Sequence, residues 1–163
     1  MKDQQQLFVK MALSAWETYV KRTDTLINTF TDEQLLREVA PGRNRGIYLL
    51  GHLATVSDGM FTLFSLSDKL YPQLETPFLK NADRDGSDQY SVADLRKYWN
   101  EINEKLTNHF NKMTPETWFE KHTAVSQEEF EKEPHRNKLN VLINRTNHLS
   151  YHYGQLVLIS KNE

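Results

Sequence analysis

Two histidines near the carboxyl end of the chain, His148 and His152, are separated by four positions. On a helix this spacing places the two side chains one turn apart on the same face, where both rings can bind one metal ion. The imidazole nitrogen is a ligand that zinc, nickel and iron all accept. Among six histidines, chance gives such a pair roughly one time in five, so the pair alone is a weak signal.

A third histidine, His52, lies inside the most apolar stretch of the sequence, residues 47–56. A buried ionisable group needs a hydrogen bond, a charged partner or a metal ion, because burying it alone costs free energy. A lone histidine in such a place is more often a neutral core residue bonded to a carbonyl group. In combination with the spaced pair, it favours one divalent metal ion held by His52, His148 and His152.

Several other kinds of site are excluded by what the sequence lacks. No glutamate follows His148, as the helical metalloprotease pattern requires, and none precedes any histidine by three positions, as in di-iron bundles. A glycine-rich phosphate loop and a Gly-x-Ser-x-Gly elbow are missing. The absence of cysteine removes thiolate zinc sites and a cysteine nucleophile. The remaining histidines, His109, His122 and His135, fall near helix ends or loops and are interpreted as surface residues.

Helical periodicity dominates the elements that must position these residues. Apolar residues at steps of three and four predict long helices over about residues 3–30, 44–66, 91–113 and 137–160. Short helical turns are expected over about 31–38 and 114–118, and a loop over 120–136. No segment has the alternation of a strand. The sequence therefore predicts an all-α four-helix bundle, with residues 1–163 forming a single domain.

A long connection over residues 67–90 separates the second and third long helices. It is long enough for a crossover, so a simple up-and-down order does not follow. Long ordered loops in compact domains often carry binding function. We therefore expect this connection at the mouth of the site, with Tyr71, Phe78 and Tyr90 as candidates for contacting substrate.

Composition limits the partners. The chain has 163 residues and a formal net charge of −2, with basic and acidic residues interleaved along its length. Nucleic acid is not an expected partner, because no concentrated basic face is present to meet a phosphate backbone. The first residues lack the apolar core of a signal peptide, and no apolar stretch approaches the ~20 residues of a membrane span. We expect a cytoplasmic protein without a membrane partner.

The sequence resembles the DinB-like (YfiT-like) superfamily of metalloenzymes. The resemblance is carried by Gly51-His52-Leu53, by His148-x-x-x-His152-x-Gly154-Gln155 and by Tyr71-Pro72-x-Leu74. It implies a four-helix bundle with a crossover connection and one metal ion on His52, His148 and His152. It implies no polymerase or DNA-binding activity. Many relatives carry a tryptophan before the second helix, where this chain has Arg43-Asn44-Arg45, so the substrate of any one relative does not transfer.

Two classes of function remain open. Three neutral imidazoles leave the fourth position of zinc free, which is typical of catalytic sites and can activate water or a thiol. Some members of the resembled family transfer low-molecular-weight thiols, so a thiol transferase is the first hypothesis and a hydrolase the second. The alternative is a non-catalytic metal- or ligand-binding bundle that dimerises through an apolar helix face. Gln155, one turn from His152, is expected either to orient a ligand or to bond between helices.

Overall fold

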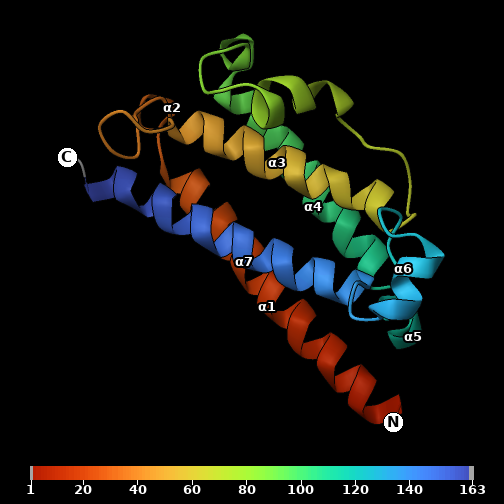
Figure 1. Ribbon diagram of the computed structural model, residues 1–163. Coiled ribbons are helices and arrows are strands. Elements are labelled where there is room, and N and C mark those ends of the chain that lie inside the picture. The colour runs from red at the N-terminus through yellow and green to blue at the C-terminus, as the bar shows by residue number, and fades with distance from the viewer. Residues whose placement is uncertain (1, 162–163) are drawn as a thin grey trace.

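The structure, a computed structural model, describes residues 2–161, and within this range the chain is helical without a β-strand (Figure 1). The long helices are α1 (Lys2–Thr29), α3 (Gly46–Leu63), α4 (Val92–Phe110) and α7 (Lys138–Val157). The short elements are α2 (Asp32–Leu35), η1 (Pro72–Leu74), the π-helical turn η2 (Thr76–Lys80), η3 (Ser87–Gln89), α5 (Pro115–Trp118), α6 (Gln127–Lys132) and η4 (Leu158–Lys161). The all-α prediction is confirmed. The assignment of residues 1–163 to a single domain stays a prediction.

Capping residues in the sequence set where the helices begin. The Ser91 hydroxyl accepts a bond from the backbone N–H of Asp94, whose carboxylate bonds back to Ser91, and α4 starts between them. The same reciprocal pair, Ser126 with Glu129, opens α6. The prediction of a loop over residues 120–136 is therefore wrong in part, because this capping box satisfies the first N–H groups of a short helix despite the polar composition.

Helix α3 is the most apolar of the long helices, and most of its residues are buried. It is enclosed on several sides, since α4, α7 and the turn η2 all pack against it. An apolar circumference is what such a central position requires. None of the helices within residues 2–161 combines the length and the apolar character needed to cross a membrane.

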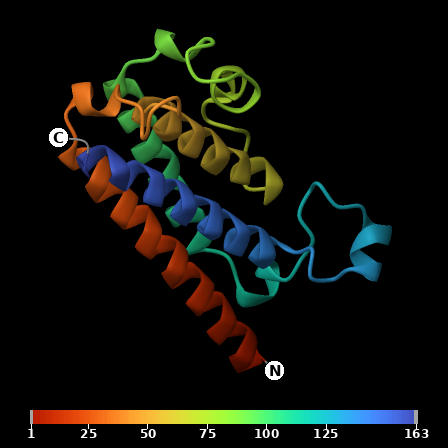
Figure 2. The same ribbon diagram turned by 60° about the vertical axis from the view of Figure 1, so that its left-hand side comes forward.

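The connection over residues 67–90 runs back along α3, so α3 and α4 point in the same direction (Figures 1 and 2). It leaves the carboxyl end of α3, where the Asp58 carboxylate accepts a bond of 3.0 Å from the backbone N–H of Tyr71. It then reaches the amino end of α3, where the Arg45 guanidinium pairs with Asp83 at 2.6 Å. The predicted crossover is confirmed.

Helix α7 lies beside α3 and runs in the opposite direction, with α1 packed along it (Figures 1 and 2). At one end, Gly46 of α3 packs against the Ile159 side chain, just beyond α7. At the other end, the carbonyl of Leu63 accepts a bond of 3.0 Å from the backbone N–H of Thr123, in the segment that leads to α7. The two helices are thus held together at both ends, and their middle turns face each other.

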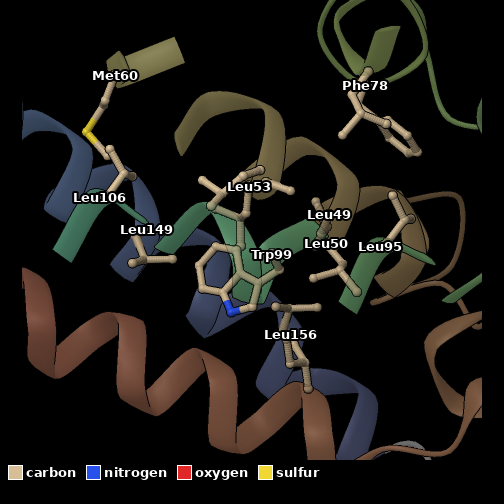
Figure 3. Close-up of a cluster of buried hydrophobic side chains, with 14 of the residues drawn as sticks. Leu49, Leu50, Leu53, Met60, Phe78, Leu95, Trp99, Leu106, Leu149 and Leu156 are labelled. Atoms are coloured by element: carbon tan, nitrogen blue, oxygen red, sulfur yellow. The ribbon is translucent and has the colours of Figure 1, made fainter. Parts of the chain in front are cut away.

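The core lies between α3, α4 and α7 (Figure 3). Trp99 of α4 is 1% exposed and is surrounded there by leucines from all three helices. The leucines labelled in this cluster are Leu49, Leu50, Leu53, Leu95, Leu106, Leu149 and Leu156. Helix α1 joins this core through Trp16, whose ring meets that of Phe110 edge-on at 5.0 Å between centroids. Burial of this apolar surface stabilises the packing of α3 against α4 and α7.

Candidate metal centre

The three predicted histidines come together where α3 and α7 face each other. His52 lies on α3, and His148 and His152 lie on successive turns of α7. The Nε2 atom of His148 is 3.1 Å from Nε2 of His52 and 3.1 Å from Nε2 of His152. One nitrogen from each ring fits within a 4.8 Å span. The arrangement is compatible with one metal ion bound by all three residues.

Hydrogen bonds fix the protonation of two of the rings. The Nδ1 atom of His52 lies 2.8 Å from the backbone carbonyl oxygen of Phe78, in the turn η2. The Nδ1 atom of His152 lies 2.6 Å from Oε1 of Gln155. Each of these oxygens can only accept, so each Nδ1 carries the proton and each Nε2 presents a lone pair. The orienting role expected for Gln155 is confirmed, and the bond lies within α7 rather than between helices.

The fit of a cation to this donor set follows from counting lone pairs. The lone pairs of His52 and His152 both point at Nε2 of His148, which can carry at most one proton and so can satisfy only one of them. A divalent ion accepts all three nitrogens at once. Nδ1 of His148 is buried without a hydrogen-bond partner among the described residues, so it lacks the fixed partner that the other two rings have.

Electrostatics keep the three rings neutral. Burial lowers the pKa of His52 and His152, and it acts with the neighbouring rings and with Arg145 to lower the pKa of His148 to about 4. The bond from His52 to Phe78 and the bond from His152 to Gln155 each oppose the effect in part. No carboxylate contributes to any of these shifts. Neutral imidazole is the form that binds metal, so near pH 7 the three rings are in the form that a metal site requires.

The cluster is partly exposed to solvent. All three histidines are half-buried, and no fourth histidine, aspartate or glutamate joins them within residues 2–161. Beside them, the Tyr151 ring is 63% exposed and meets the His152 ring edge-on at 5.0 Å. Structural zinc sites are normally closed by four protein ligands, whereas catalytic sites keep a position free. Within residues 2–161 the cluster offers three histidine, aspartate or glutamate ligands, one fewer than a closed structural zinc site.

The connection over residues 67–90 reaches the site, as predicted, but through its backbone. The Phe78 side chain is fully buried, so its expected role as a substrate contact is wrong. The Tyr71 hydroxyl donates to Glu101 of α4, and Tyr90 packs against the Phe78 ring. Among the described residues, none of these three rings pairs with a histidine ring of the cluster, and the bond from the connection to the cluster comes from the Phe78 carbonyl.

Two neighbours of the site have no counterpart in the sequence-based prediction. The Tyr48 ring lies parallel to that of His52 at 6.3 Å, and its hydroxyl donates to the carbonyl of Asn81. Arg145 lies one turn before His148 on α7 and lowers the pKa of both His52 and His148. The signal for each was helical spacing, since Tyr48 precedes His52 by four positions and Arg145 precedes His148 by three.

The other three histidines stay outside the cluster. His135 is exposed, as predicted. The surface interpretation of the other two is wrong in part, because both are half-buried. His109 packs edge-on against the Phe61 ring at 5.9 Å, and Nδ1 of His122 is buried. His109 lies in the last turn of α4, and His122 lies in the segment between α5 and α6.

Comparison with known proteins places the chain in a family. The model of the DinB superfamily matches residues 15–156, a range that includes all three histidines and the elements that carry them. The chain belongs to the DinB superfamily. No curated protein was found to match it. The match confirms the resemblance carried by Gly51-His52-Leu53 and by the motif from His148 to Gln155.

Proposed function

We propose that this member of the DinB superfamily binds one divalent metal ion on His52, His148 and His152 and uses it to activate the thiol of a small substrate for transfer to an electrophile. The observation that carries the proposal is the convergence of three Nε2 atoms, two of them held as lone-pair donors by Nδ1–H bonds. Imidazole donors suit zinc, nickel or iron, and any of these fits the set.

The chemistry follows from an open position on a cationic site. A divalent ion held by His52, His148 and His152 would lower the pKa of a thiol or a water molecule bound to it. The thiol is the easier group to activate, because its ordinary pKa is about 8.5, against 15.7 for water. Among the described residues no carboxylate acts on the three rings, so a general base for attack by water has no evident source.

The residues of the chain contribute orientation. The Phe78 carbonyl and the Gln155 side chain hold the rings of His52 and His152 with Nε2 toward the shared position. The buried face of α3 behind His52 keeps water from that side. The substrate approaches from the solvent-exposed side, next to Tyr151.

Metal binding is tested first, on protein purified without a histidine tag. Mass-spectrometric metal analysis and calorimetric titration with Zn²⁺ and Ni²⁺ are expected to show one ion per chain. His52→Ala, His148→Ala and His152→Ala each remove a proposed metal ligand. Loss of a residue that only orients a ligand lowers metal affinity about 10–100-fold, and we expect each of these three variants to lower it more. His135→Ala is the matched control, because its side chain is exposed and outside the cluster. Full occupancy in all three variants would refute the metal site.

Activity is tested second, by comparing metal-loaded and metal-free protein in a screen of small thiols against alkylating electrophiles. Loss of thiol consumption on metal removal, with recovery on reloading, supports the transferase. Hydrolysis of esters or amides without thiol consumption would support the hydrolase instead. Stoichiometric metal binding with neither reaction would favour the non-catalytic binding bundle.

A further inference from the structure

Arg145 is a guanidinium without an anionic partner within residues 2–161. Its Nε atom is buried and has no hydrogen-bond partner among the described residues. By contrast, Arg45, Arg84, Arg96 and Arg136 each pair with a carboxylate. Burial lowers the pKa of Arg145, and no acidic side chain of the described chain contributes to the shift. A half-buried charge without a partner is costly, which points to an anion from outside the chain.

The position of Arg145 ties it to the histidines. Three positions before His148, it lies on the same face of α7, where neighbouring Cβ atoms are about 5–6 Å apart. Its charge lowers the pKa of His52 on the facing helix as well as that of His148. With a divalent ion bound, the local charge is about +3, and no carboxylate within the described chain offsets it. Such a site attracts an anion strongly.

Helix α3 carries partly exposed residues on the turns that follow His52. Val56 and Gly59 follow His52 at helical steps of four and three, and both are partly exposed. A Cβ atom built on Gly59 would meet nothing within 4 Å. Because α3 and α7 are antiparallel, the turns after His52 lie toward the turns before His148, where Arg145 is. The turns of α3 nearest to Arg145 therefore carry partly exposed residues, one of them a glycine.

We propose that Arg145 binds an oxyanion group, a carboxylate or a phosphate, on the same small molecule that reacts at the three-histidine site. The inference rests on the proposed function and adds the substrate class, an anionic thiol rather than a neutral one. The planar guanidinium fork can donate two parallel bonds to such a group, and water-poor surroundings strengthen them. With the fork only about one helical turn from the histidines, the thiol and the anion must be a few bonds apart.

The test compares two thiols that differ in charge. Zn²⁺-loaded protein is titrated calorimetrically with mercaptoacetate and with 2-mercaptoethanol. We expect mercaptoacetate to bind at least about tenfold more tightly, since a charge-assisted bond is worth about 1.5–3 kcal/mol and 1.4 kcal/mol is tenfold. Arg145→Gln should lose the tenfold preference for mercaptoacetate, while its affinity for 2-mercaptoethanol should be unchanged. Arg145→Lys, which keeps the charge but not the fork, should lose less.

The matched control is Arg22→Gln, which removes one positive charge from an exposed side chain of α1 that contacts the Tyr19 ring. It should leave both affinities unchanged. Equal affinity for the two thiols in the unaltered protein would overturn the proposal. A preference for mercaptoacetate that survives in Arg145→Gln would also overturn it, because the carboxylate would then bind the ion rather than the guanidinium.

A metal-free arm separates this proposal from the function on which it rests. Inorganic phosphate is added to metal-free protein while the Nε–H signal that Arg145→Gln removes is followed by nitrogen-15 NMR. A saturable shift of that signal, absent for 2-mercaptoethanol, supports the anion site even if Zn²⁺ fails to bind and the proposed function falls. No shift with phosphate, together with normal Zn²⁺ binding, refutes the role of Arg145 and leaves the metal site standing.

Discussion

The Nδ1 atom of His52 lies 2.8 Å from the carbonyl oxygen of Phe78, which joins the metal-facing side of α3 to the crossover connection. The Phe78 ring packs over Gly51, the residue before His52, and is itself fully buried. A single residue of the connection thus fixes both the ring orientation of a candidate ligand and the fit of the helix beneath it. The connection is part of the site's construction.

The contact between Phe78 and Gly51 predicts a substitution that couples packing to metal affinity. A Cβ atom on residue 51 would lie 2.4 Å from the Phe78 ring, so Gly51→Ala must displace that ring. Overpacking of this kind costs about 1–3 kcal/mol of unfolding free energy. Because the Phe78 carbonyl moves with its residue, Zn²⁺ affinity should fall too. Chemical denaturation and calorimetric titration measure the two effects.

Gly59→Ala is the control for this substitution on the same helix. A Cβ atom there meets nothing within 4 Å. The usual helix preference for alanine over glycine should therefore stabilise the protein by about 0.5–1 kcal/mol. Zn²⁺ affinity should not change. If Gly51→Ala behaves like Gly59→Ala, the Phe78 ring is not held against the helix.

Gln155 predicts a test of ring orientation at the other end of the cluster. Gln155→Leu removes the oxygen that accepts the Nδ1–H of His152 at 2.6 Å. The ring is then free to turn or to change tautomer, and Zn²⁺ affinity should fall about 10–100-fold. Gln155→Glu keeps an acceptor at nearly the same place and should retain or raise the affinity. Equal losses in both variants would show that the amide does more than accept this bond.

The ion pair between Arg45 and Asp83 predicts a large loss of stability. The two side chains are 11% and 5% exposed, and the connection depends on them to reach the amino end of α3. Asp83→Asn leaves a buried guanidinium with only Asp88 as a charged partner. Removing one member of a buried pair lowers the unfolding free energy by about 3–5 kcal/mol. Because Asp88 still pairs with Arg45, we expect a loss near the lower figure.

The control for Asp83→Asn is Glu133→Gln, which breaks a pair with Arg136 whose side chains are 34% and 52% exposed. Exposed pairs contribute under about 1 kcal/mol, so this variant should unfold at nearly the same denaturant concentration as the unaltered protein. A loss of similar size in both variants would contradict the structural role of Asp83. Urea unfolding followed by circular dichroism gives both values.

Helical spacing made the three histidines predictable. His148 and His152 had to share a face once their segment was helical, and His52 stood out as an ionisable group in an apolar helix. The Phe78 carbonyl was not predictable, because every residue carries one and only the path of the connection selects this one. The partner of each ring nitrogen is a property of the tertiary structure, which no local pattern records.

The pairing of charged residues was likewise beyond the sequence. Arg45 and Asp83 are far apart in the chain and look like ordinary surface charges until the connection folds back. Arg145 was visible at helical spacing from His148, but its lack of a partner depends on which acids pack nearby. The short helix α6 was in principle predictable, since Ser126 and Glu129 form the same kind of capping box as Ser91 and Asp94.

The depressed histidine pKa values predict how metal binding depends on pH. An ordinary histidine, with a pKa of about 6.5, is mostly protonated at pH 5.5, whereas burial lowers the pKa of all three rings, that of His148 to about 4. Protons compete with the ion only below those values. Zn²⁺ affinity should therefore change little between about pH 7.5 and 6.5. The pH at which it begins to fall should be lower than the pH at which an exposed histidine pair begins to lose Zn²⁺. Calorimetric titration in a pH series measures this.

The same values predict how the stability of the metal-free protein depends on pH. Between about pH 4 and 6.5 the unfolded chain binds more protons at these histidines than the folded chain does, so stability rises with pH through that range. The contribution of these histidines to stability should be fully present above about pH 6.5 and should be lost progressively as the pH falls toward 4. His148→Ala removes the ring with the lowest pKa and should flatten the curve, whereas the exposed His135→Ala should leave it unchanged. Parallel curves for these two variants would mean that His148 titrates as an ordinary histidine, and the neutral three-imidazole site would lose its electrostatic basis.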